Sequence, residues 1–327
     1  MHRLRHILLI YIAFLALSCE KGQLPPSLEE GTDAVRFAIS SSDVKTRGTT
    51  LADFALNDAI AITGFFLDNT LALAPTAKPN FMYEQRVSKQ ADGTWTYGPT
   101  KYWSNDPADH YIFFGRHPVE HSNITDISGN STAGFPSFVY TMPEAIANQI
   151  DLMVANTSLV TKRASTPIPF DHALSKITFA VKGDDVNRFI KSVTLHTIKP
   201  KATLEFTSDD FRWLFDAATA ATDITANIEN GALRNDVTTA STTQSISTDA
   251  GCLFVLPQLI NKLLITVVTN DGTADQTQTL TLSKEQGWAP GKAYEYTFNL
   301  YGEGKELWID GAITDWILLP SDLPSFE

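Results

Sequence analysis

Short runs of alternating apolar and polar residues recur along most of this 327-residue sequence. The clearest runs are rich in Thr, Val, Ile and aromatic residues, and they span 35–40, 60–65, 176–181, 263–268, 277–282 and 294–300. Alternation with a period of two predicts strands that bury one face. Turn residues separate the runs, and Asp92-Gly93 and Asn270-Asp271-Gly272 are predicted hairpin turns. Helical signals are sparse and short, at 143–150 and 208–211. The pattern therefore predicts an all-β chain and favours a β-sandwich architecture.

The first nineteen residues follow a different pattern. Basic residues precede an apolar run over 7–17, which ends in Ser18-Cys19. This order predicts an export signal, and residues 15–19 resemble the bacterial lipobox, whose Cys becomes the lipidated first residue of the mature protein. The run is shorter than the roughly 20 residues that span a bilayer. We therefore predict a lipoprotein signal peptide over 1–18 and acyl chains on Cys19 that attach the chain to a membrane. An ordinary signal peptide that ends near a cysteine is the alternative.

Composition narrows the class of protein further. Hydrophobic residues make up 43% and charged residues 19% of the chain, which is typical of a globular protein. The net charge of −12 argues against binding to nucleic acid or to anionic lipid. Cys252, the second of two cysteines, lies in an apolar run and is predicted to be a buried, inert thiol.

The length suggests two domains. The proline-containing stretch 161–169 is a plausible boundary. We predict a linker over 19–34, an N-terminal domain over 35–165 and a C-terminal domain over 166–327. Residues 219–248, rich in Ala, Thr, Asn and Asp, are predicted to form a long surface excursion.

Enzymatic and metal-binding functions find little support in the sequence. His110, His117 and His121, with Glu120 and Asp109, suggest a metal site, but their spacing matches no strong metal motif. The sequence contains no nucleophile elbow, no Walker loop and no zincin motif. We therefore expect no enzymatic activity, no catalytic residue, no cofactor and no metal.

Five groups of residues, taken in order, resemble the fimbrillin family of two-domain pilins and its fimbrillin-like lipoproteins. They are Cys19 with the following strand and the Lys45-Thr46-Arg47-Gly48 segment, Lys101-Tyr102-Trp103 with the aromatic strand 109–115, the Phe-x-His-x-Leu-x-Lys element over 170–176, the Pro-Gly-x-x-Tyr-x-Tyr element over 290–296, and Ile313-Thr314-Asp315-Trp316. The resemblance covers most of the mature chain. It implies two transthyretin-like β-sandwich domains in tandem, and a pilus subunit exported as a lipoprotein to the outer membrane and cell surface.

The resemblance also implies a maturation step. An arginine-specific surface protease would cut between Arg47 and Gly48 and remove the lipidated N-terminus with its first strand, which carries Val35, Phe37 and Ile39. A donor strand from another pilin subunit would then fill the vacated groove. The donor maps to residues 307–320, with Ile313, Asp315, Trp316, Ile317 and Leu319 as its candidate contacts. A host or bacterial surface receptor is a further implied partner.

The residues themselves leave alternatives open. Most of 307–320 is apolar, which suits a donor that buries both faces, but also a last strand folded into its own domain. Arg47 lies among small and polar residues, which suits an exposed cleavable loop or an ordinary polar loop. A rival hypothesis is a lipid-anchored protein that binds glycans on an aromatic platform of Trp95, Tyr97, Tyr102 and Trp103. A pilus anchor, which would keep its lipid and first strand, is another.

Overall fold

A computed structural model describes residues 33–41, 54–55, 57–185, 187–232, 243–247, 252–282, 286–300 and 308–315. Within these residues the regular structure is β-strand apart from the 3₁₀ turn η2 (Ile146–Asn148). This confirms the predicted all-β class. No helix in the same ranges combines the length and the apolar character needed to cross a membrane.

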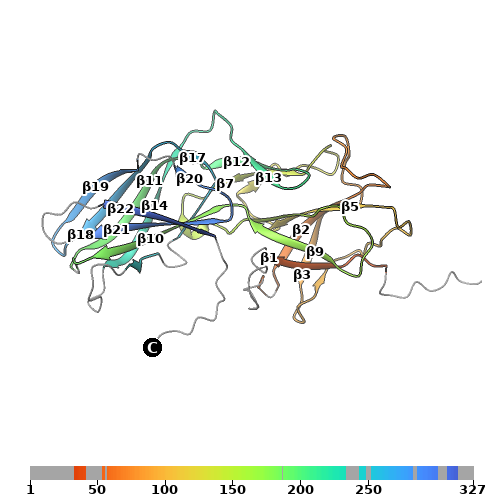
Figure 1. The fold of residues 1–327 in the computed structure, drawn as a ribbon, viewed down its shortest axis with the longest axis horizontal. Coiled ribbons are helices and arrows are strands. Elements are labelled where there is room, and N and C mark those ends of the chain that lie inside the picture. The colour runs from red at the N-terminus through yellow and green to blue at the C-terminus, as the bar shows by residue number, and fades with distance from the viewer. Residues whose placement is uncertain are drawn as a thin grey trace, which may run out of the picture.

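Two β-sheets form the N-terminal lobe, on the right of Figure 1. The larger has seven strands in the order β1 (Phe37–Ser41), β9 (Thr166–His172), β8 (Met153–Asn156), β5 (Tyr111–His117), β2 (Ala59–Phe66), β3 (Met82–Lys89) and β4 (Trp95–Thr96). The smaller has four, β13 (Phe211–Leu214), β12 (Lys201–Phe206), β7 (Ser137–Thr141) and β6 (Ile124–Thr125).

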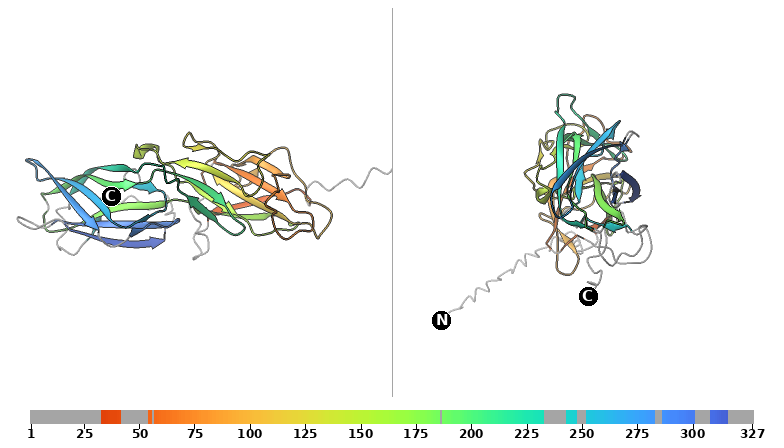
Figure 2. Two further views of the ribbon diagram at one scale, coloured as in Figure 1. Left: turned by 90° about the horizontal axis from the view of Figure 1, so that it is seen from above. Right: turned by 90° about the vertical axis from the view of Figure 1, so that its left-hand side faces the viewer.

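The remaining strands form the C-terminal lobe. One sheet contains β15 (Gln244–Ser245), β10 (Ser175–Gly183), β21 (Lys292–Leu300) and β22 (Trp308–Asp315), with β16 (Leu253–Val255) paired to β10. The other contains β14 (Thr222–Ala232), β11 (Phe189–Ile198), β18 (Leu263–Asn270) and β19 (Asp275–Leu282). A short pair joins β17 (Leu259–Ile260) to β20 (Gln286–Gly287). The lobes lie end to end in an elongated molecule (Figure 2).

Several of the alternating runs became strands with one buried face, as in β18, whereas β2 is buried on both faces. All six predicted runs overlap strands, and both predicted hairpin turns are present, with Gly93 at φ 82° and Gly272 at φ 91°. The predicted surface excursion over 219–248 was wrong in its first part. Ile224, Ala226 and Ile228 alternate along β14 and are buried, so the small polar residues between them mark the outer face of a strand rather than a loop.

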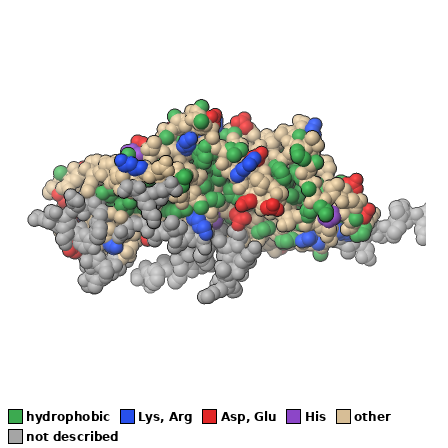
Figure 3. Space-filling model, turned by 45° about the horizontal axis from the view of Figure 1, so that its top comes forward, with side chains coloured by type: hydrophobic (Ala, Val, Ile, Leu, Met, Phe, Trp, Pro, Cys, Tyr) green, Lys and Arg blue, Asp and Glu red, His purple; other side chains and the backbone are tan. Residues whose placement is uncertain are grey.

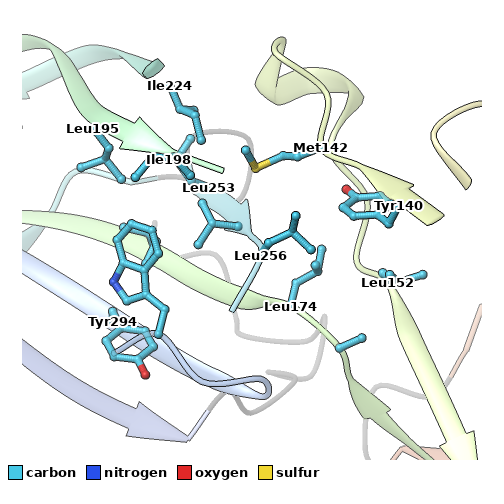
Figure 4. Packing of buried hydrophobic residues seen from close by; sticks show 14 of the residues in the cluster. Tyr140, Met142, Leu152, Leu174, Leu195, Ile198, Ile224, Leu253, Leu256 and Tyr294 are labelled. Carbon is cyan, nitrogen blue, oxygen red and sulfur yellow. The ribbon is translucent and has the colours of Figure 1, made fainter. Parts of the chain in front are cut away.

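The two lobes share a buried core, and strands from beyond the predicted boundary join the N-terminal lobe. β9 follows the predicted boundary at residue 165, yet it pairs with β1 and β8 of the N-terminal lobe. β12 likewise pairs with β7. Figure 4 shows Met142, Leu174 and Leu256 pointing into one apolar region between the lobes, and all three belong to a single cluster of buried residues. The tandem-domain arrangement over 35–165 and 166–327 stays a prediction.

Candidate functional site

The first strand, β1, lies at one edge of the seven-stranded sheet (Figure 1). It runs parallel to β9 over five register pairs, from Phe37 opposite Thr166 to Ser41 opposite Phe170. The amide of Thr166 donates a hydrogen bond of 2.8 Å to the carbonyl of Arg36. Every other strand of this sheet lies after residue 58. The N-terminal segment therefore completes a sheet that the rest of the chain builds.

Alternate side chains of β1 and of the two residues before it enter the core. Val35, Phe37 and Ile39 are 1%, 5% and 8% exposed, whereas Arg36 and Ala38 face solvent. The Phe37 ring meets Phe113 edge to face at 5.3 Å between centroids and Tyr97 at 5.7 Å. Each buried apolar side chain of this size contributes about 1.5–3 kcal/mol. The three together bind β1 with about 5–9 kcal/mol of apolar burial, an upper estimate.

A second wall borders the start of β1 on the side away from β9. The amide of Val35 donates to the carbonyl of Lys101 at 2.8 Å, and its carbonyl accepts from the Tyr97 hydroxyl at 2.7 Å. The amide of Trp103 donates to the carbonyl of Asp33 at 2.8 Å. We call the surface formed by β9, Phe113 and residues 97–103 the first-strand groove. The Lys-Tyr-Trp element singled out in the sequence supplies part of this groove.

The groove has a closely packed floor. The Phe170 ring, fully buried, lies over Gly115 on β5, where an added Cβ would come within 2.6 Å of Phe170 Cζ. Only glycine leaves room for the ring at this position. Val35, Phe37 and Ile39 belong to the same buried cluster as Phe170.

The chain returns to the same core at Phe54. Its ring contacts Phe170 at 5.4 Å, Trp95 at 5.5 Å and His117 at 5.0 Å between centroids. Burial lowers the pKa of His117 below its usual 6.5, because desolvation disfavours the charged ring. Residues 42–53, which contain Arg47 and Gly48, therefore connect two parts of the chain that pack on one core.

The predicted site residues fall into two groups. Val35, Phe37 and Ile39 lie in the first-strand groove, as described above. Ile313 and Asp315 lie on β22, opposite Tyr294 and Lys292 of β21 in an antiparallel register of eight pairs. The rest lie outside the described residues: Cys19, Arg47, Gly48, Trp316, Ile317 and Leu319. In the described part of the chain, β22 pairs only with β21, so it is an edge strand of its own lobe.

The Phe-x-His-x-Leu-x-Lys element forms the crossing between the lobes. Phe170 belongs to the buried cluster of the groove and Leu174 to the cluster shared by both lobes. Between them, His172 Nδ1 lies 2.8 Å from Asp151 Oδ1, and Trp213 Nε1 donates to the carbonyl of Ala173 at 2.9 Å. His172 is buried at this crossing and contacts Asp151, so its role there is in packing and hydrogen bonding.

The Pro-Gly-x-x-Tyr-x-Tyr element forms a turn held by its own tyrosines. The Tyr294 hydroxyl donates to the carbonyl of Gly287 at 2.7 Å and accepts from the amide of Ala289 at 2.8 Å. Trp288 Nε1 lies 3.0 Å from the Tyr296 hydroxyl, and burial raises the pKa of Tyr296 to about 12. These residues are structural.

The aromatic platform of the rival glycan-binding hypothesis does not form. Trp103 is 4% exposed, stands edge to face against Tyr111 and donates through Nε1 to the carbonyl of Arg163. Tyr97 is half-buried against β1, and only Tyr102 of the four is well exposed, at 55%. Aromatic residues in this stretch form the groove wall because their large apolar rings are more stable packed against the edge of the sheet than exposed to solvent.

Metal-ligating side chains do not gather within the described ranges, where no group of three or more His, Cys, Asp or Glu is placed to hold an ion. His117 lies against Phe54, and His121 Nδ1 is 3.3 Å from the amide of Asn123. Cys252 is buried, as predicted.

Sequence reasoning missed three residues of the site: Tyr97, Phe113 and Phe54. The signal for Phe54 was its position as an isolated aromatic residue after a polar segment. Tyr97 and Phe113 were visible only as members of aromatic strands, because their partner across the groove is some 60 or more residues away.

Comparison with known proteins agrees with this arrangement. A family model described as fimbrillin-like matches residues 46–316. No curated protein matches the sequence. The chain is similar in fold to the crystal structure of a fimbrial protein from Bacteroides vulgatus, with a TM-score of 0.65 and 18% identity over 87% of this chain and 99% of that one.

Two further solved structures share the fold. A candidate cell adhesion protein from Bacteroides ovatus has a TM-score of 0.58 and 19% identity over 88% of this chain and 98% of that one. Another from Bacteroides uniformis has a TM-score of 0.55 and 16% identity over 88% of this chain and 99% of that one. Because the family model covers most of the sequence, the chain belongs to the fimbrillin-like family.

Proposed function

We propose that this protein is a pilus subunit that is exported as a lipoprotein, cut after Arg47 and polymerised by strand donation. Its family places it among fimbrial and cell-adhesion proteins of the cell surface, which are structural rather than enzymatic. The steps of maturation and assembly are our inference, and the first-strand groove supports them.

One observation carries the proposal. β1 is an edge strand, so its removal breaks one strand ladder, the one with β9, together with the hydrogen bonds that Asp33 and Val35 make to residues 97–103. Removal of β1 would expose the unpaired backbone of β9 and the apolar pockets that Val35, Phe37 and Ile39 fill. A cut between residues 41 and 54 would separate β1 covalently from the sheet that it completes. The family model starts at residue 46, beside Arg47, and leaves β1 outside its match.

The vacated groove sets requirements on a donor. An added strand restores the backbone pairing and fills alternate pockets with its side chains. The Phe37 pocket, lined by Tyr97 and Phe113, suits an aromatic ring. In the candidate donor, one face carries Ile313, Asp315, Ile317 and Leu319, and the other carries Thr314, Trp316 and Leu318. We infer that the second face enters the groove, with Trp316 in place of Phe37, since a carboxylate in that pocket would be buried without a partner.

The donor must first leave its own lobe. β22 pairs only with β21 among the described strands, so its release breaks one ladder and leaves the β15-β10-β21 core of that sheet in place. The uncut subunit would thus be complete in itself, with β1 and β22 each held at an edge. After the cut, only non-covalent contacts would hold β1, so a donor strand from another subunit could displace it and take its place in the groove. A subunit that escaped the cut would act as a pilus anchor and keep its lipid.

Substitution at the cut site tests the proposal. The Arg47→Ala variant should accumulate as a folded, lipidated precursor that forms no filaments. Lys45→Ala, which removes a positive charge two residues away, is the matched control and should assemble normally. Electron microscopy and immunoblots of surface extracts distinguish the two. Normal filaments from Arg47→Ala would contradict the proposed cut.

A further inference from the structure

A pocket of about 410 Å³ opens on the C-terminal lobe, away from the first-strand groove. Residues at the end of β11, the loop that follows β13, and the segment around β17 meet there. In Figure 1 the β13–β14 loop arches near β17 at the top of the molecule. The volume falls within the range of small-ligand sites.

The pocket carries positive charge on an acidic protein. Lys199 and Lys262 line it, and none of its lining residues is Asp or Glu, although the chain has a net charge of −12. The described residues give neither lysine an ion-pair partner, and Lys199 Nζ lies 5.8 Å from the centre of the Phe215 ring. Two lysines in a lining without acidic residues favour an anion as the ligand.

The same pocket presents apolar surface. Leu259 is 66% exposed, which is unusual for a large aliphatic side chain here, and the Phe215 ring is half-buried beside it. Asn261 adds a polar residue to the lining. Figure 3, which brings the top of the molecule forward, shows Lys and Arg side chains set among hydrophobic ones on this face.

Hydrogen bonds fix the backbone around the pocket before any ligand binds. Gln258 accepts a hydrogen bond from the amide of Lys199 at 3.0 Å and donates to the carbonyl of Lys199 at 3.3 Å. Thr197 has a φ of 66°, a costly conformation for a β-branched residue. Its amide donates to Asp223, whose carboxylate also binds His196 at 2.8 Å. Strained residues held by their surroundings mark functional sites more often than ordinary surface.

We propose that this pocket binds a carboxylated sugar residue. The ammonium groups of Lys199 and Lys262 would bind the carboxylate. The apolar face of the sugar ring would pack against Phe215 and Leu259, and Asn261 would form a hydrogen bond with a sugar hydroxyl. A free phosphate would use the charges but leave the apolar walls exposed. A neutral sugar would leave both ammonium groups unpaired. The proposal is independent of cleavage and strand donation, since no residue of the pocket lies in β1, in β22 or in the first-strand groove.

A matched pair of sugars tests the proposal on the intact precursor. Galacturonic acid and galactose differ only in the carboxylate, and titration followed by saturation-transfer NMR measures both. We expect galacturonic acid to bind at least about tenfold more tightly, because a charge-assisted hydrogen bond is worth a factor of this order. The preference should shrink as NaCl rises from 50 to 500 mM.

Variants locate the site. Lys262→Gln and Phe215→Ala should each weaken the binding of galacturonic acid by about tenfold. Lys78→Gln, which replaces an exposed lysine in the other lobe, should leave this binding unchanged. Equal binding of the two sugars, no binding of galacturonic acid at 50 mM NaCl, or unchanged binding in Lys262→Gln would each overturn the proposal. Tighter binding of a tetra-aspartate peptide than of the sugar would overturn it in favour of an acidic peptide. Filament formation by Lys262→Gln reports separately on the pilus function.

Discussion

Truncation of Phe37 should loosen the first strand selectively. The side chain is 5% exposed and meets two rings, at 5.3 and 5.7 Å. Replacing a buried Phe by Ala costs about 3–5 kcal/mol, the sum of lost burial and the cavity left behind. Since each 1.4 kcal/mol corresponds to a factor of ten, Phe37→Ala should weaken the affinity of the sheet for β1 by about 10²- to 10⁴-fold.

Cleavage in vitro makes this loss measurable. The purified uncut precursor is treated with an arginine-specific protease, and the N-terminal peptide is followed by size exclusion and mass spectrometry. In the wild type the peptide should stay bound after the cut, held by the buried side chains and its pairing with β9. From Phe37→Ala it should dissociate. Arg36→Ala, on the exposed face of the same strand, is the control and should retain its peptide. Equal retention by Phe37→Ala and the wild type would refute the assignment of β1 binding to this pocket.

Three further predictions concern the same core and its donor. Burial lowers the pKa of His117 in the folded chain, so as the pH falls the unfolded chain takes up the proton first. The unfolding free energy measured with urea should therefore be constant above about pH 6.5 and decrease below it. His117→Gln should make this decrease smaller. Gly115→Ala places a methyl group against Phe170 and should lower the unfolding free energy by about 1–3 kcal/mol, whereas Gly98→Ala, which meets open space, should change it little. Trp316→Ala should leave the cut subunit folded but lower its rate of polymerisation, measured by light scattering. Asp315→Ala should lower this rate less. A larger decrease in Asp315→Ala than in Trp316→Ala would mean that the other face of the donor enters the groove.

The strands were predictable where alternation is strong, and less so elsewhere. The run at 263–268 carries apolar residues at every second position and became β18, whose burial alternates, whereas the run at 60–65 became β2, which is buried on both faces. β14 was missed because Ala and Thr dominate its sequence, and only Ile224 and Ile228 signal its buried face. Burial against β11 decided its structure, not intrinsic propensity.

The partners of β1 could not be read from the sequence. Alternation identified Val35, Phe37 and Ile39 as one buried face, but parallel pairing with β9 joins residues about 130 positions apart. Such a pairing leaves no local signal, since parallel strands need a long connection. For the same reason, the sequence did not show that β9 and β12 would join the N-terminal lobe rather than the lobe that follows them.

The N-terminal residue of the protein on the cell surface tests the central claim most directly. Intact mass and N-terminal sequencing of filaments sheared from cells give the start of the chain and show whether lipid is attached. Our account predicts a chain that begins at Gly48 and carries no lipid. A filament subunit that begins at lipidated Cys19, with β1 still attached, would contradict it.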